Sequence, residues 1–270
     1  MLLYEHIASW AQHRQTWLNG RRDNAPAFAC APPALHMVLL GTAGTGKTHT
    51  AKLAIRKARK VFGHYNSALA ASFSGVAVAN VGGGSRTIVC VFHTNDEKAL
   101  DDATGDRLDE LVAQLGHVEL LLVDDIATVG AAQFEIMNRR LQQVATVVYR
   151  QRFGREPPDD MGSFGGVGVV LTGDFAQPPP VMATSLLIGN LIMERHTSGL
   201  RGHALVGQKT FRNFIQVLRL MRIHQQNGPD AFKESTMCLR DAAITLEDYE
   251  LWQEHEVDYR SNSHGCLGRR

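Results

Sequence analysis

The chain has 270 residues, of which 44% are hydrophobic, so it can bury a sizeable core in one large domain or two small ones. Its 28 basic and 27 acidic residues leave a formal net charge of +1, which argues against a strongly basic coat for non-specific DNA binding but not against a local groove. Its four cysteines lie far apart and form no C-x-x-C pair, so neither zinc nor a disulfide framework is expected.

The expected secondary structure alternates strands with helices. Apolar residues at helical spacing predict an amphipathic helix over residues 2–18, whose apolar face we assign to the core. Strands are expected near 36–40, 68–73, 119–124, 167–172 and 215–219, and further helices near 47–62, 107–115 and 131–149. This alternation predicts an α/β fold in which a parallel sheet is covered on both faces.

Other segments are expected on the surface. Arg139 and Arg140 should lie on a solvated helix face, and the basic run 55–60 should be the exposed face of its helix, with cations at the C-terminal end that the helix dipole favours. Residues 182–207 should form a long, glycine-punctuated insertion, and 261–270 a frayed polar tail.

The most informative pattern is a G-x-x-x-x-G-K-[ST] loop between the strand expected near 36–40 and the helix expected near 47–62, because that loop wraps nucleotide phosphates. Its glycines permit backbone angles that let N–H groups converge on phosphate oxygens. Lys47 is expected to reach the β- and γ-phosphates, and the Thr48 hydroxyl to ligate Mg2+. The expected nucleotide-binding residues are Gly41, Thr42, Ala43, Gly44, Thr45, Gly46, Lys47 and Thr48.

Two later strand ends carry polar residues expected to face the same ligand. The apolar run from 119 ends in Asp124 and Asp125, where parallel sheets bind ligands. Asp124 is expected to hold Mg2+, directly or through water, and Asp125 to act as a base or orient water. The next strand leads into Gly-Asp-Phe-Ala-Gln, whose Gln177 can report whether a γ-phosphate is present.

Taken together, these motifs resemble the first RecA-like domain of a superfamily 1 DNA helicase, and most nearly the PIF (petite integration frequency) helicases, relatives of the RecD type. The resemblance spans about residues 37–252, and its Ser-Gly-Val-Ala and Gly-Asp-Phe-x-Gln-x-Pro-Pro segments are far more specific than the phosphate loop. The matching stretches are 41–48, 73–83 with Thr87 and Ile88, 122–126, 164–166, 173–181 and 217–222, followed by Phe232, Leu239, Arg240 and Thr245.

The resemblance implies a RecA-like domain over 34–255, preceded by a helix and connector (1–33) and followed by a polar tail (256–270). It implies an ATP-dependent DNA helicase with ATP and Mg2+ as cofactors and single-stranded DNA as partner. Gln177 and Arg222 would contact the γ-phosphate beside the catalytic Asp125. The implied DNA contacts are Phe73, Ser74, Gly75 and Asn80, with Phe73 or Phe92 stacking on a base.

The chain departs from the family pattern in three places. Asp125 stands where the family has Glu, which is one methylene longer. Val89 and Cys90 stand where the family has His and Ser, which removes two polar contacts near DNA. No second RecA-like domain is evident before Arg270, so we expect the chain to be truncated and weak in hydrolysis.

Two other functions remain open. A degenerate ATP-binding switch would bind nucleotide and a partner but turn over poorly, and the short acid and the absence of an evident second domain favour it. The third candidate function is a small-molecule kinase of the phosphate-loop class, against which the Gly-Asp-Phe-x-Gln motif argues.

No apolar run approaches the ~20 residues that cross a bilayer, and no signal peptide is evident. We therefore expect no membrane contact and an intracellular location, in the nucleus or mitochondrion if the organism is eukaryotic.

Overall fold

The computed structural model describes most of the chain in two compact units. The described residues are 2–22, 32–94, 99–154, 156–157, 161–187, 198–224, 231, 234–235, 237–238 and 243–254. Contacts between residues define one unit as Met1–Arg222 and the other as Ile223–Arg270. The domain boundaries expected after residues 33 and 255 stay a prediction, and the expected tail at 256–270 lies outside the described residues.

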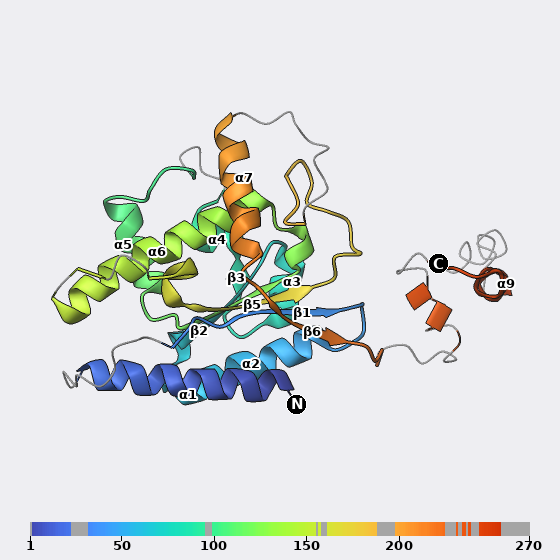
Figure 1. Ribbon diagram of the computed structural model, residues 1–270, viewed down its shortest axis with the longest axis horizontal. Helices are drawn as coiled ribbons and strands as arrows, with labels where there is room; N and C mark the ends of the chain where they lie inside the picture. The colour runs from blue at the N-terminus through green and yellow to red at the C-terminus, as the bar shows by residue number, and fades with distance from the viewer. Residues whose placement is uncertain are drawn as a thin grey trace, which may run out of the picture. The chain divides into compact units, whose positions relative to one another are not determined.

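A six-stranded, all-parallel β-sheet forms the centre of the first unit, in the order β3-β2-β4-β5-β1-β6 (Figure 1). The strands are β1 (His36–Gly41), β2 (Ala68–Ser72), β3 (Arg86–Thr87), β4 (Leu120–Asp124), β5 (Gly168–Gly173) and β6 (Gln216–Leu220). All but β3 were expected within a residue of these bounds, and β3 is too short to show a periodicity. Because the strands are parallel, their carboxyl ends share one edge of the sheet.

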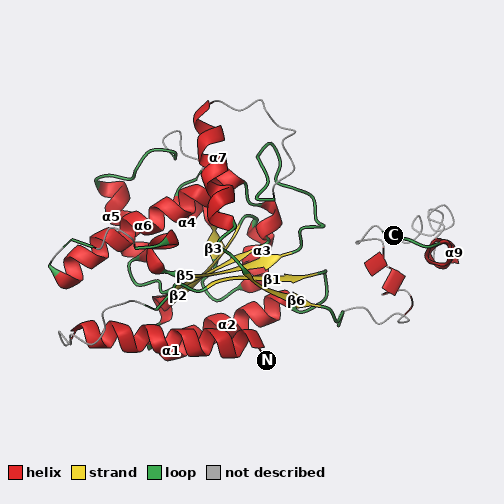
Figure 2. Cartoon of the chain, in the orientation of Figure 1, coloured by secondary structure: helices red, strands yellow, loops and turns green. Residues whose placement is uncertain are grey.

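Helices cover both faces of this sheet (Figures 1 and 2). On one face lie α1 and α2, and on the other α5, α6 and α7 (Figure 1). The bounds are α1 (Leu2–Arg22), α2 (Lys47–Phe62), α3 (Gly75–Val81), α4 (Ile88–Phe92), α5 (Asp106–Leu115), α6 (Ala131–Phe153) and α7 (Ser198–Phe211). None of the described helices is long and apolar enough to cross a membrane.

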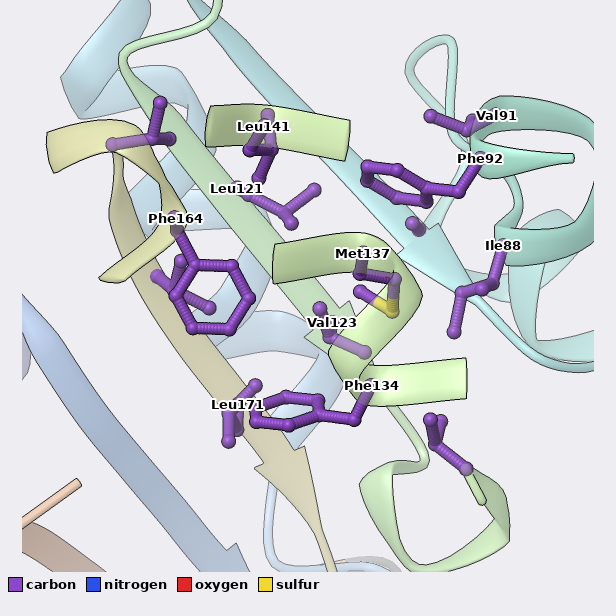
Figure 3. Packing of buried hydrophobic residues seen from close by; sticks show 14 of the residues in the cluster. Ile88, Val91, Phe92, Leu121, Val123, Phe134, Met137, Leu141, Phe164 and Leu171 are labelled. Atoms are coloured by element: carbon purple, nitrogen blue, oxygen red, sulfur yellow. The ribbon is translucent and has the colours of Figure 1, made fainter. Parts of the chain in front are cut away.

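The core is double because β4 sends alternate side chains to opposite faces, as the two-residue period of a strand requires. Leu120 and Leu122 join the cluster under α1 and α2, whereas Leu121 and Val123 join the cluster under α6. Figure 3 shows this second cluster, to which α6 contributes its apolar stripe. In this stripe Phe134, Met137, Leu141 and Val144 are buried, and Val148 is partly buried against the same cluster.

Helix α1 is part of the core, as its apolar spacing predicted. Ile7 is fully buried, and the Trp10 indole donates a hydrogen bond to the Pro33 carbonyl (3.2 Å). The ring of Trp10 lies so close to β5 that a Cβ at Gly168 would come within 2.5 Å of it. A nearly buried ion pair between Arg14 Nε and Glu119 Oε2 (3.1 Å) also ties α1 to the start of β4.

The expectation of a solvated face on α6 is wrong. Arg140 is 1% exposed and donates to the Ala99 carbonyl (3.0 Å), while Arg139 pairs with Asp102 and donates to the Leu100 carbonyl (2.6 Å). These guanidinium groups satisfy the carbonyl groups of a loop that covers the helix.

The basic run of α2 is exposed only in part. Arg56 and Lys60 are exposed, as expected. Arg59, by contrast, donates to the carbonyl groups of Ala68 (2.9 Å) and Gly83 (3.0 Å) and stacks on the Tyr65 ring. One of the expected solvated cations therefore joins α2 to β2 and to the turn after α3.

The glycine-punctuated insertion expected at 182–207 includes the start of a helix, because α7 begins at Ser198. Residues 188–197 lie outside the described part. Gly207 lies where α7 meets α6, and a Cβ there would be 1.9 Å from the Ala131 carbonyl oxygen. Gly202, in the same helix, faces open space. The absence of a side chain at Gly207 therefore permits close packing of α7 on α6.

The second unit contains α9 (Leu246–Glu254), which begins with a reciprocal cap. The Asp248 amide donates to Thr245 Oγ1 (3.2 Å), and the Thr245 amide donates to Asp248 Oδ2 (2.9 Å). Of the matches expected in this region, Phe232, Leu239 and Arg240 lie outside the described residues.

Gly207→Ala is predicted to destabilise the protein by about 1–3 kcal/mol, because its methyl group would overlap backbone atoms that cannot move without separating α6 from α7. Gly202→Ala is the matched control. It should stabilise the protein by up to about 1 kcal/mol, since alanine lowers the entropy cost of the helix. Urea denaturation of both variants measures the difference, and equal effects would contradict the packing we describe.

Candidate functional site

The loop between β1 and α2 has the backbone that phosphate binding requires. Gly44 (φ 79°) and Gly46 (φ 88°) adopt left-handed conformations, and α2 begins directly afterwards at Lys47. Amide groups at the start of a helix have no partner within it and carry the positive end of the helix dipole. Gly41 is needed for space, because a Cβ there would be 2.4 Å from Thr45 Oγ1. The loop therefore presents N–H groups to an anion.

Lys47 folds back over this loop. Its ammonium donates to the carbonyl oxygens of Gly41 (2.7 Å) and Thr42 (2.8 Å), and the Thr45 hydroxyl also donates to the Thr42 carbonyl (2.8 Å). The Thr42 hydroxyl is buried without a hydrogen-bond partner among the described residues. The loop thus places a cation, and a hydroxyl that no described residue bonds, beside the first amide groups of α2, which suits a phosphate group.

Asp124 ends β4 at the same edge of the sheet and is 4% exposed. Its Oδ1 accepts hydrogen bonds from the Thr172 hydroxyl and from the Asp125 amide (3.1 Å). The Ser72 hydroxyl donates to its main-chain carbonyl (3.2 Å). Within the described part of the chain, Oδ2 receives no hydrogen bond, so this oxygen is available to a cation.

Asp125 has an unusual backbone and a perturbed carboxyl group. Its φ of 56° and ψ of 45° are left-handed, which is uncommon for a residue with a side chain, although Asp tolerates it better than most. Burial and the neighbouring Asp124 charge raise the pKa of its carboxyl group, while the Lys47 ammonium lowers it. Lys47, Asp124 and Asp125 therefore form one electrostatic group.

Gln177 and Arg222 lie along the same edge but do not touch these groups. Gln177 is in the turn after β5, where its main-chain N–H donates to the Asp174 main-chain carbonyl (3.0 Å). Arg222 follows β6, whose Leu220 is paired in register with Gly41, and it is exposed. Among the described residues, neither side chain hydrogen-bonds to Lys47 or to the aspartates. The fold brings their segments to the site without setting their side chains.

The expected DNA contacts surround the end of β2. Phe73 is 43% exposed, Gly75 begins α3, and Asn80 is exposed on that helix. The Ser74 hydroxyl caps α3 by accepting a hydrogen bond from the Ala77 amide (3.2 Å). The expectation that Phe92 could stack on a base is wrong, because Phe92 is fully buried in the core (Figure 3).

Sequence reasoning missed the two hydroxyls beside Asp124. Ser72 and Thr172 are both almost fully buried at the ends of the strands that flank β4. The available clue was a hydroxyl residue at the last position of β2 and at the last but one of β5, but strand propensity alone explains a threonine in a strand.

A model of the PIF1-like helicase family matches residues 31–229. The chain belongs to the PIF1-like helicase family. The match includes all six strands, the phosphate loop and both aspartates, whereas α1 lies before it.

Individual relatives agree with this assignment. The ATP-dependent DNA helicase RRM3 of Saccharomyces cerevisiae is 30% identical over 148 residues, which are 52% of this chain and 18% of RRM3. Bacteroides Pif1 bound to ssDNA superimposes with a TM-score of 0.56 at 22% identity, covering 82% of this chain and 46% of that one. Pif1 from Candida albicans gives 0.56 at 17% identity, covering 89% and 46%. These similarities confirm the RecA-like fold, and the chain spans less than half the length of these relatives.

Asp125→Asn is predicted to raise the melting temperature near neutral pH, because an amide has no charge to bury beside Asp124. The pKa of Asp125 is raised in the folded protein above its ordinary value of 3.8, so wild-type stability falls as pH rises through the folded pKa. The advantage of the variant should therefore shrink as pH is lowered toward that ordinary value. Thermal denaturation across this range measures it.

Asp101→Asn is the control, because Asp101 is exposed and forms no ion pair in the described part of the chain. It should change the melting temperature little at any pH. A pH-independent gain in Asp125→Asn would show that its charge is not the source of the cost.

Proposed function

We propose that the chain is the nucleotide-binding domain of an ATP-dependent DNA helicase, in which ATP hydrolysis drives movement along single-stranded DNA. The observation that carries the proposal is the electrostatic group of Lys47, Asp124 and Asp125 at the mouth of the phosphate loop. Membership of the PIF1-like helicase family supports it. A structural neighbour, Bacteroides Pif1, has been solved in complex with ADP-AlF3 and ssDNA, which supports the choice of ligands.

The side chains at the loop fit ATP and Mg2+. Lys47 would exchange the carbonyl groups of Gly41 and Thr42 for β- and γ-phosphate oxygens. Thr48, at the start of α2, and Asp124, through its Oδ2, would hold Mg2+ between them. A bound Mg2+ neutralises charge on the phosphate oxygens. The Thr42 hydroxyl, which has no hydrogen-bond partner among the described residues, lies in the same loop and would offer a further hydrogen bond to the nucleotide.

Asp125 would position the attacking water and accept its proton. A raised pKa suits this role, because a base is most effective when its pKa approaches the working pH. Gln177 and Arg222, in the segments after β5 and β6, would contact the γ-phosphate. Both segments lie beside β1, so a small closure around the nucleotide would bring them nearer.

The surface at the end of β2 would contact single-stranded DNA. Phe73 would stack on a base, while Ser74, Gly75 and Asn80 would meet the phosphates and sugars without reading sequence. Ser72, paired in register with Asp124, directly precedes Phe73. A movement of Asp124 could therefore be passed through Ser72 to Phe73, the next residue along the chain, at the DNA surface.

A DNA helicase acts inside the cell, and in a eukaryote we propose the nucleus or mitochondrion.

A degenerate ATP-binding switch is the second candidate. The observation that favours it is Asp125, which is a methylene shorter than the family's Glu and is held in a left-handed backbone. Such a carboxylate could lie near the bound nucleotide yet fail to reach the water that attacks the γ-phosphate. DNA-dependent turnover separates the two functions, since a switch would bind ATP without it.

Lys47→Ala is predicted to weaken binding of a non-hydrolysable ATP analogue at least tenfold, because it removes a charge-assisted contact worth about 1.5–3 kcal/mol. Lys60→Ala, which removes an exposed cation from the far end of the same helix, should leave the affinity unchanged. Fluorescence titration measures both. Unchanged affinity in Lys47→Ala would mean that nucleotide binds elsewhere or not at all.

A further inference from the structure

Strand β5 carries a polar side chain where its neighbours are apolar. Thr172 is 0% exposed, and the residues before it, Val169 to Leu171, are buried hydrophobic side chains. Val123 on β4 is paired in register with Leu171, so Thr172 lies beside Asp124. Its hydroxyl donates a hydrogen bond to Asp124 Oδ1. A buried hydroxyl thus donates its hydrogen bond to the carboxylate that we assign to Mg2+.

We propose that Thr172 is a positioning residue that sets the affinity of the site for Mg2+ by orienting Asp124, an inference that rests on the proposed function. Oδ1 is occupied by two donors, the Thr172 hydroxyl and the Asp125 amide. Those bonds fix the rotation of the carboxylate and leave Oδ2 as the oxygen for a cation. Hydrogen-bonding partners of metal ligands commonly act in this way.

Ser72 provides an internal contrast on the opposite side of Asp124. Its hydroxyl is equally buried but donates to the main-chain carbonyl of Asp124, not to the carboxylate. Ser72 therefore supports the strand, and Thr172 supports the ligand. Removing the two hydroxyls separates an effect on the Mg2+ ligand from an effect on packing at the sheet edge.

The test is a Mg2+ titration of the binding of a fluorescent, non-hydrolysable ATP analogue to the full chain. Thr172→Val keeps the shape of the side chain but lacks the hydroxyl. It should raise the Mg2+ concentration at half-maximal effect by about 10–100-fold, the usual cost of losing such a partner. Affinity measured in EDTA should stay at the wild-type value. Thr172→Ser should restore the wild-type Mg2+ dependence, and Ser72→Ala should keep it.

If Thr172→Val does not fold, Thr172→Ser and Thr172→Ala form a pair that differs only in the hydroxyl, and Ala alone should show the shift. An unchanged Mg2+ midpoint in the hydroxyl-free variants overturns the inference. So does an equal loss of affinity in Mg2+ and in EDTA, which would mark a packing defect. If the wild-type chain binds no analogue under either condition, the proposed function fails and this inference fails with it.

Discussion

The parallel pairing of β4, β5 and β1 is the constraint on which the site depends. Because these strands run in the same direction, the phosphate loop after β1, the turn after β5 and the two aspartates after β4 all emerge at one edge. The apolar side chains of β4 fix this register. A slip of one residue would move Leu121 and Val123 to the face that Leu120 and Leu122 now occupy, and the reverse, so each core would lose its own side chains. Packing far from the nucleotide thereby sets the positions of charged groups near it.

Charge at that edge is arranged at a cost to stability. Two carboxylates stand side by side, one almost fully buried and the other in a left-handed backbone, and the Lys47 ammonium group lies near them. Lys47 also donates to loop carbonyl groups, and phosphate oxygens would replace these contacts when nucleotide binds. Strain and repulsion of this kind are typical of functional sites, where the surrounding fold supplies the stability.

The sequence predicted most of the fold because the strongest patterns are local. Five strands, the helices at α1, α2, α5 and α6, and the phosphate loop all follow from periodicity and one motif. The errors came from tertiary contacts. Arg140 looks like a surface cation until a loop covers it, Phe92 cannot be assigned to the core from a short helix, and Gly207 serves helix packing that no local pattern records. For the site, the motifs located the aspartates, whereas the left-handed Asp125 and the hydroxyl of Thr172 depend on neighbouring strands.

ATP turnover with and without single-stranded DNA tests most directly whether the nucleotide site and the surface at Phe73 act together. The account predicts a low rate without DNA that rises when DNA is added, and a smaller rise in Phe73→Ala. Tyr4→Ala, which removes an equally exposed aromatic ring from α1, should respond like the wild type. A rate that DNA does not change, in a chain that binds ATP, would contradict the coupling and favour a switch that binds nucleotide without helicase chemistry.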